Sequence, residues 1–132
     1  MSRKNLIKLF LRLALGLSFL SACADRFGIW PAARSAWGNM EKFTLYTGKL
    51  LPWLPTVVIP TFAWLATILE LGLGILLLVG FKLRWVANLS GILLLSFAFS
   101  MFFFLSPKAP FDYSVFSAAM GAFALAILDR RD

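Results

Sequence analysis

Four long runs of apolar residues fill most of this chain, at about residues 6–24, 57–79, 85–105 and 111–128. Each is close to the roughly 20 residues that a helix needs to cross a bilayer, and the fourth is the shortest. The runs are continuous rather than alternating, and lipid admits only helices or closed barrels. We therefore predict an all-α membrane protein in which residues 1–132 form one domain, an antiparallel bundle of four transmembrane helices.

The long polar segment 25–56 joins the first two runs. Asn39 is a residue type that caps helix N-termini, and Pro52 and Pro55 would end a helix near Leu51. The tryptophans of this segment suit the headgroup region, where such amphipathic rings are enriched. We expect a long outer loop with a short helix along the membrane surface.

Composition supports the membrane assignment and sets an orientation. Hydrophobic residues make up 61% of the chain and charged residues only 14%, and the net charge of +7 comes from basic residues that flank the runs. No basic helix or aromatic-basic platform lies outside the runs, so we do not expect a nucleic-acid partner. Basic residues favour the cytoplasmic side, which predicts N-in and C-in. They are concentrated at both termini and in the second turn: Arg3, Lys4, Lys8, Lys82, Arg84, Arg130 and Arg131.

Two apolar runs contain a full charge: Arg12 in the first and Glu70 in the second. A charge in the hydrocarbon region is costly and normally faces a partner or a cavity. We expect the two to form a buried pair between helices one and two. The pair is either a packing clamp or the polar floor of a pocket for quinone or another ligand, or of a proton relay.

Small and polar residues surround this predicted pair. Gly16 shares a helical face with Arg12, and Thr67 and Gly74 share one with Glu70, so two helices can approach closely there. Arg84 and Asn88 lie on one face at the start of the third helix. At the outer ends of helices one and four are three more polar candidates, with Asp112 suited to cap helix four and Asp25 to an ion pair: Asp25, Asp112 and Tyr113.

Several kinds of chemistry lack the residues they need. Histidine is absent and Cys23 is the sole cysteine, so neither a His/Cys zinc site nor a histidine-activated nucleophile can be built, and we predict no catalytic residues and no metal site. The residues before Cys23 resemble a bacterial lipoprotein cleavage site. Arg12 interrupts what would be the uncharged signal core, so we expect an uncleaved first helix with Cys23 in packing.

Motifs spread along the chain resemble the DoxX family of small integral membrane proteins. They are residues 12–20 with 25–28, the Glu70-Leu-Gly-Leu-Gly74 segment, residues 78–84 and residues 108–114. The resemblance implies a four-helix bundle in the bacterial inner membrane. Some relatives are subunits of thiosulfate:quinone oxidoreductase, and the family's charged positions correspond to Arg12, Glu70 and Arg84 here.

These observations lead to three candidate functions. The first is a membrane-embedded partner of a redox system, with quinone as its ligand and at most the role of an oxidoreductase subunit. The second is a non-enzymatic assembly or anchoring subunit that docks a partner protein through the outer loop. The third, a small transporter or proton path in a homo-oligomer, ranks last because no inverted repeat or broken helix is visible.

Overall fold

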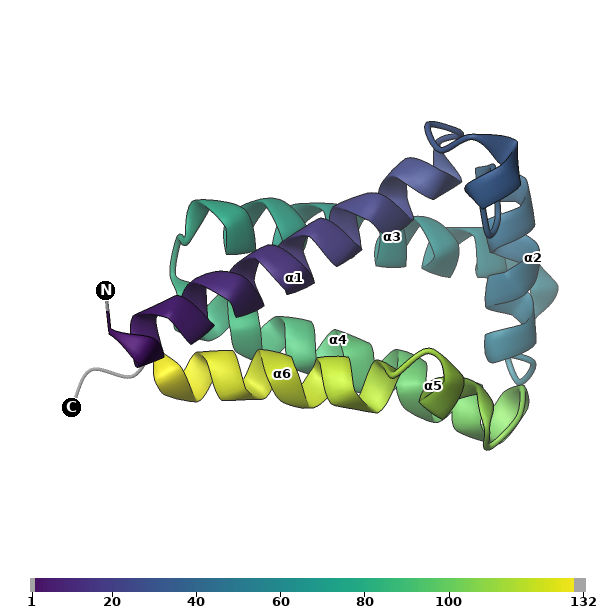
Figure 1. The fold of residues 1–132 in the computed structure, drawn as a ribbon. Helices are drawn as coiled ribbons and strands as arrows, with labels where there is room; N and C mark the ends of the chain where they lie inside the picture. Colours follow the sequence, from purple (N-terminus) through teal and green to yellow (C-terminus); the bar gives the residue numbers. More distant parts are fainter. Residues whose placement is uncertain (1, 130–132) are drawn as a thin grey trace.

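The computed structural model describes residues 2–129, and within this range the chain is helical with no strand. Three helices have more than 20 residues, and shorter ones connect or follow them; Figure 1 shows their arrangement. In chain order they are α1 (Arg3–Arg26), the 3₁₀ turn η1 (Ala32–Arg34), α2 (Met40–Leu50), the 3₁₀ turn η2 (Thr56–Val58), α3 (Ile59–Val79), α4 (Leu83–Phe104), α5 (Ala109–Asp112) and α6 (Val115–Leu128).

Three of the four apolar runs form helices that are long and apolar enough to cross a membrane. These are α1, α3 together with the turn that precedes it, and α4, at 24, 24 and 22 residues. At 1.5 Å per residue each exceeds the roughly 30 Å of a hydrocarbon core. The expected all-helical membrane architecture is confirmed for these three.

The fourth run differs from the prediction. A continuous helix was expected over residues 111–128, but the backbone of Ser114 is left-handed, with φ 54°, and divides the segment into α5 and α6. Only α6, at 14 residues, is a regular helix beyond the break. A left-handed residue cannot continue a right-handed helix, so α6 begins only after Ser114. At 1.5 Å per residue, α6 is about 21 Å long.

The helices pair into two layers (Figure 1). In that view α1 and α3 lie above, and α4 and α6 lie below. The layers meet where α1 begins, α3 ends, α4 begins and α6 ends, which we call the terminal end. A cluster of buried apolar side chains joins the layers there, including Leu77, Val86 and Leu125. Toward the opposite end, α1 diverges from α6, and α2 stands across that end, so we call it the α2 end.

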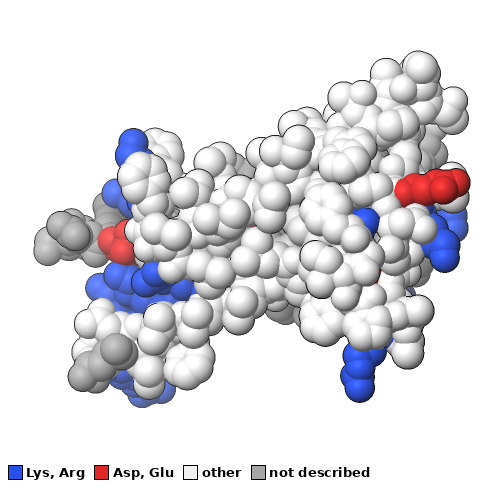
Figure 2. Space-filling view, turned by 90° about the horizontal axis from the view of Figure 1, so that it is seen from above, with Lys and Arg blue, Asp and Glu red and all other residues white. Residues whose placement is uncertain are grey.

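Charged side chains gather at these two ends, and the middle of the molecule is almost free of them on the face shown in Figure 2. Large apolar side chains are exposed along the middle of α1, α3 and α4, including Leu17, Ile68 and Ile92. An uncharged middle with charged ends is what a lipid environment requires.

The helix α2 is built from an amphipathic sequence. The side chain of Asn39 accepts a hydrogen bond from the backbone N–H of Lys42, at 2.8 Å, which satisfies one of the free donors at the start of the helix. Phe43, Thr47 and Leu50 form its buried face. The helix α2 contacts both α3 and α4, so it links the two layers at the end where α1 diverges from α6 (Figure 1).

Candidate functional site

Among residues 2–129, the most deeply buried ion pair lies between α1 and α3. The Nη1 atom of Arg26, the last residue of α1, donates to Oε2 of Glu70 in the middle of α3. The two side chains are 3% and 5% exposed. Nη1 also donates to the hydroxyl of Thr67 at 3.1 Å, and that hydroxyl donates to the carbonyl of Ala63 at 2.8 Å. The contacts neutralise two charges that would otherwise be costly at this depth.

Aromatic rings of the connecting segment cover the Arg26 guanidinium. Its central carbon lies 3.6 Å from the centre of the Phe43 ring and 5.0 Å from that of Trp37. The two rings meet edge to face with centres 5.0 Å apart. A desolvated cation over an aromatic face gains about 2 kcal/mol or more. Arg26 therefore fastens α2 and the preceding loop to the long helices, while its Nε has no hydrogen-bond partner among the described residues.

The predicted pairing of Glu70 with Arg12 is corrected by this arrangement. Arg12 lies at the terminal end, where its Nε donates to the carbonyl of Leu77 at 3.0 Å and its Nη2 to that of Leu78 at 2.8 Å. These carbonyls belong to the last turn of α3. No further helical turn follows to supply them with backbone N–H donors. Arg12 thus caps a helix C-terminus, a position where a cation is favoured.

The register of α1 against α3 explains why Glu70 pairs with Arg26 and not with Arg12. Gly16 lies against Gly74: a Cβ atom on Gly16 would lie 3.1 Å from the Gly74 carbonyl oxygen, and one on Gly74 would lie 3.2 Å from that of Gly16. With these glycines opposed, Cys23 lies beside Thr67, to whose carbonyl its thiol donates at 3.5 Å. Glu70 then faces the C-terminal end of α1, two helical turns or more from Arg12.

The polar residues predicted at the outer ends have separate partners. The carboxylate of Asp25 accepts from the hydroxyl of Ser35 at 2.5 Å and from the backbone N–H groups of Ala36 and Trp37 at 2.8 and 3.1 Å. Asp25 therefore does not form the expected ion pair. Its carboxylate instead accepts hydrogen bonds from the loop that follows η1. Asp112 forms an exposed ion pair with Lys108 at 2.8 Å.

Asp112 does not cap α6 as predicted, because Ser114 occupies the N-cap position and makes no side-chain capping bond. Tyr113, beside it, is exposed. At the other end of the molecule, Arg84 is exposed and lines a charged hollow, and Asn88 is half-buried one turn further along α4. Neither residue approaches the Glu70 pair. The structure thus does not bring the predicted site residues together into one site.

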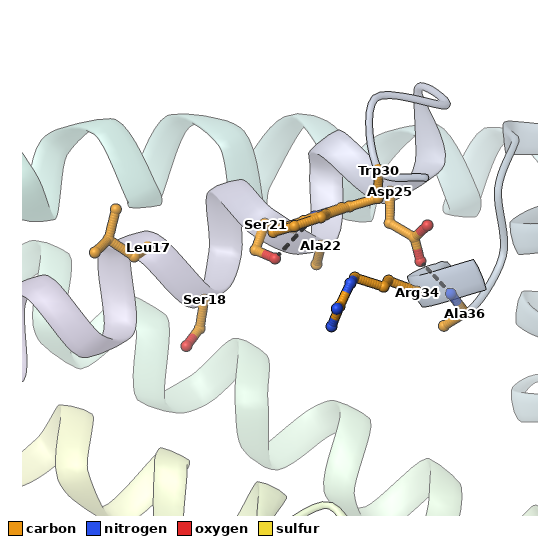
Figure 3. Close-up of a pocket in the computed structure, with 8 residues that line it drawn as sticks. All are labelled: Leu17, Ser18, Ser21, Ala22, Asp25, Trp30, Arg34 and Ala36. Carbon is orange, nitrogen blue, oxygen red and sulfur yellow. Dashed lines mark hydrogen bonds between the residues drawn. The ribbon is translucent and has the colours of Figure 1, made fainter. Parts of the chain in front are cut away.

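An open groove lies on α1 at the α2 end, with a volume of about 650 Å³ (Figure 3). The Trp30 ring lies along it, fixed because its Nε1 donates to the carbonyl and the hydroxyl oxygen of Ser21, both at 3.1 Å. The Arg34 guanidinium reaches into the open space below that ring (Figure 3). The lining combines polar and apolar groups from α1 and the loop: Leu17, Ser18, Ser21, Ala22, Asp25, Trp30, Arg34 and Ala36.

The DoxX family model matches residues 7–104, which is about three quarters of the chain. The chain belongs to the DoxX family. No curated protein and no solved structure matches it. The predicted resemblance is confirmed, and with three apolar helices of spanning length it makes the chain a multi-pass integral membrane protein.

In this DoxX protein the match covers both the buried Arg26–Glu70 pair and the arginine that caps α3. It includes Arg12, Arg26, Glu70 and Arg84, and it ends with α4, before α5 and α6 begin. In residues 2–129 no three His, Cys, Asp or Glu side chains gather to hold a metal ion.

Sequence reasoning missed the residue that pairs with Glu70 in this DoxX chain. By sequence, Arg26 follows the first apolar run and resembles the other basic residues that flank the runs, whereas in the structure α1 continues through Arg26 and turns it toward α3. A helical wheel holds the missed signal, since Arg26 follows Phe19 and Cys23 on the same face at spacings of seven and three residues. The roles of Phe43, Trp30 and Arg34 depend on how the loop folds back, which no local pattern reveals.

Proposed function

We propose that this DoxX-family protein is a membrane-embedded partner of a quinone-linked redox system, and that the groove at the α2 end holds the quinone head. The observation that carries the proposal is the groove itself. Its volume of about 650 Å³ lies within the roughly 300–1,000 Å³ range of small-molecule sites. It sits on a membrane-crossing helix and is lined by both hydrogen-bonding and apolar groups.

The lining fits the chemistry of a quinone. A quinone head has a flat ring, which a fixed aromatic face suits, and two carbonyl oxygens, which need donors. Trp30 offers the face, and Arg34, which makes no ion pair among residues 2–129, offers guanidinium donors. Leu17 and Ala22 supply an apolar wall on α1. A bound quinone would supply the electron and proton acceptor that the chain's own side chains lack.

The buried contacts described above hold this groove in shape. Asp25 fixes the loop that follows Arg34 through three hydrogen bonds. Arg26, the next residue, anchors α1 to Glu70 and to the aromatic rings of Phe43 and Trp37. In this proposal Asp25, Arg26 and Glu70 are positioning residues, and Trp30 and Arg34 contact the ligand.

The proposal includes the full topology predicted from the sequence. The short α5 and α6 together form the fourth crossing, both termini lie in the cytoplasm, and the protein resides in a bacterial inner membrane. Basic residues at the terminal end support this orientation. The α2 end, with the groove, then faces the outer side of the membrane.

The test is the quinone content of protein purified gently from its native membrane. We expect stoichiometric quinone with the natural chain and its loss in the Arg34→Gln variant. Lys42→Gln is the matched control, since it removes one exposed cation from α2 and leaves the groove intact. Bulk phospholipid without quinone, or equal quinone in both variants, would contradict the proposal.

A second candidate is the assembly or anchoring subunit, favoured by large apolar side chains exposed at the α2 end. Ile29 and Leu45 are 72% and 68% exposed on segments that the Arg26 contacts fix in place. If they dock a partner, changing both to Ser releases a protein that co-purifies at fixed stoichiometry. Ile127→Ser on α6, where the residue is similarly exposed, serves as the control and leaves the complex intact. Release by the control as well would contradict this candidate.

A further inference from the structure

A second hollow, at the terminal end, has a different character from the groove. Its volume is about 520 Å³, and its lining is strongly basic. It is formed where α1 begins, where α3 turns into α4 and where α6 ends. The charged and turn residues around it are Lys8, Arg12, Gly80, Lys82, Arg84 and Asp129. Four cations face one carboxylate, so the hollow carries an excess of positive charge.

Two of the four cations are already engaged. Arg12 is held by the carbonyls of Leu77 and Leu78, and Lys8 pairs with Asp129 at 2.9 Å. Lys82 and Arg84 are exposed and form no ion pair within residues 2–129. The free positive charge of the hollow therefore comes from the start of α4.

The backbone of the turn places these two cations at the hollow. Gly80 and Lys82 are both left-handed, with φ 83° and 44°. A left-handed lysine costs about 1 kcal/mol or more, so the turn keeps this conformation only because its surroundings impose it. Gly80 has Nη2 of Arg12 2.8 Å from where its Cβ would be, so no other residue fits there without displacing Arg12. Arg12 and the turn thus fix each other.

The surroundings point to a lipid rather than a soluble anion. Large apolar side chains are exposed at the same end of the molecule: Phe81 and Trp85, adjacent in sequence to Lys82 and Arg84, and Phe10 on α1, at 56%, 71% and 61%. In a multi-pass membrane protein such side chains contact acyl chains and the headgroup boundary. A ligand that fills the hollow with a phosphate and covers these rings with hydrocarbon matches both surfaces at once.

We propose that this hollow binds the phosphodiester headgroup of an anionic phospholipid, with Lys82 and Arg84 as its phosphate ligands. Basic pockets between membrane helices offer charge and hydrogen-bond donors to such headgroups. Arg12 lines the floor and keeps the turn in place, and Asp129 opposes the anion and limits its affinity. This site is independent of the groove at the α2 end and shares no lining residue with it.

The experiment measures lipid binding to detergent-purified protein by native mass spectrometry. Phosphatidylglycerol is compared with phosphatidylcholine of the same acyl chains, and inorganic phosphate is added as a soluble competitor. The test variant is Lys82→Gln with Arg84→Gln. The control, Lys42→Gln with Lys49→Gln, removes two exposed cations from α2 at the other end. Both variants have the same net charge, so a general electrostatic effect would weaken binding equally.

We expect the natural chain and the control to retain phosphatidylglycerol over phosphatidylcholine, and the test variant to lose about tenfold or more in affinity. Asp129→Asn gives an independent reading that does not rely on removing the cations, because loss of the opposing carboxylate should strengthen binding. Equal losses in the two double variants, no preference for the anionic lipid, or unchanged or weaker binding with Asp129→Asn would each overturn the proposal. Displacement of the lipid by inorganic phosphate alone would show a soluble-anion site and overturn the lipid assignment.

Discussion

The guanidinium of Arg26 and the carboxylate of Glu70 neutralise each other across the interface of α1 and α3, with both side chains at least 95% buried. Replacing Glu70 by Gln leaves a buried cation without its counter-charge. Breaking such a pair from one side costs about 3–5 kcal/mol. We expect a large fall in the thermal unfolding midpoint of the detergent-solubilised protein, measured by tryptophan fluorescence.

The matched control removes both charges. Arg26→Met combined with Glu70→Leu should recover most of the lost stability, because apolar residues of similar volume often replace a buried pair at little cost. A Glu70→Gln variant as stable as the natural chain would show that the pair does not act as a clamp.

Arg12 should stabilise the end of α3. Its two hydrogen bonds to the carbonyls of Leu77 and Leu78 are charge-assisted, and each such bond is worth about 1.5–3 kcal/mol. Arg12→Gln should therefore speed amide hydrogen exchange in the turn after Leu78. Arg12→Lys should restore little, because a lysine is a point donor and does not span two carbonyls as the guanidinium fork does. Exchange that is unchanged in Arg12→Gln would remove Arg12 from this role.

The contact of Gly16 with Gly74 should tolerate no side chain. A Cβ on Gly74 would lie 3.1 Å from the Cβ of Phe19 and 3.2 Å from the Gly16 carbonyl oxygen. Helix backbones do not yield locally, so Gly74→Ala must push α1 away and should cost about 1–3 kcal/mol. The thermal midpoint of the variant measures this.

Gly72, two residues earlier on the same helix, is the control. Nothing lies within 4 Å of a Cβ placed there, so Gly72→Ala should leave stability unchanged or raise it by up to about 1 kcal/mol through helix propensity. Similar losses for the two alanine variants would refute the tight α1–α3 contact.

The thiol of Cys23 should be inert in the folded protein. The residue is 1% exposed and its Sγ donates to the Thr67 carbonyl. Reaction needs an accessible thiolate, so a maleimide reagent should label Cys23 only after denaturation. Thr56→Cys, at an exposed position, provides a positive control for labelling. Rapid modification of the natural chain would contradict the packing seen between α1 and α3.

Sequence reasoning reached the helices more surely than their contacts. Hydropathy locates α1, α3 and α4 within a few residues, because lipid tolerates few departures from continuous apolar helix. It failed at Ser114, whose left-handed backbone depends on how α5 turns back. It also paired Glu70 with Arg12, because the ends of the apolar runs are a poor guide to the depth of each charge in the membrane. Opposing Gly16 and Gly74, the close-contact residues, would have placed Arg12 beside Leu78.

The neutrality of the Arg26–Glu70 pair also bears on how the protein responds to membrane voltage. An isolated charge inside the bilayer feels about 2.3 kcal/mol per 100 mV of potential across the whole membrane. A cation and an anion that move together carry no net charge, so the field does almost no work when α1 and α3 shift as a unit. The contact that fastens α2 to the bundle should hold equally well in energised and in depolarised membranes.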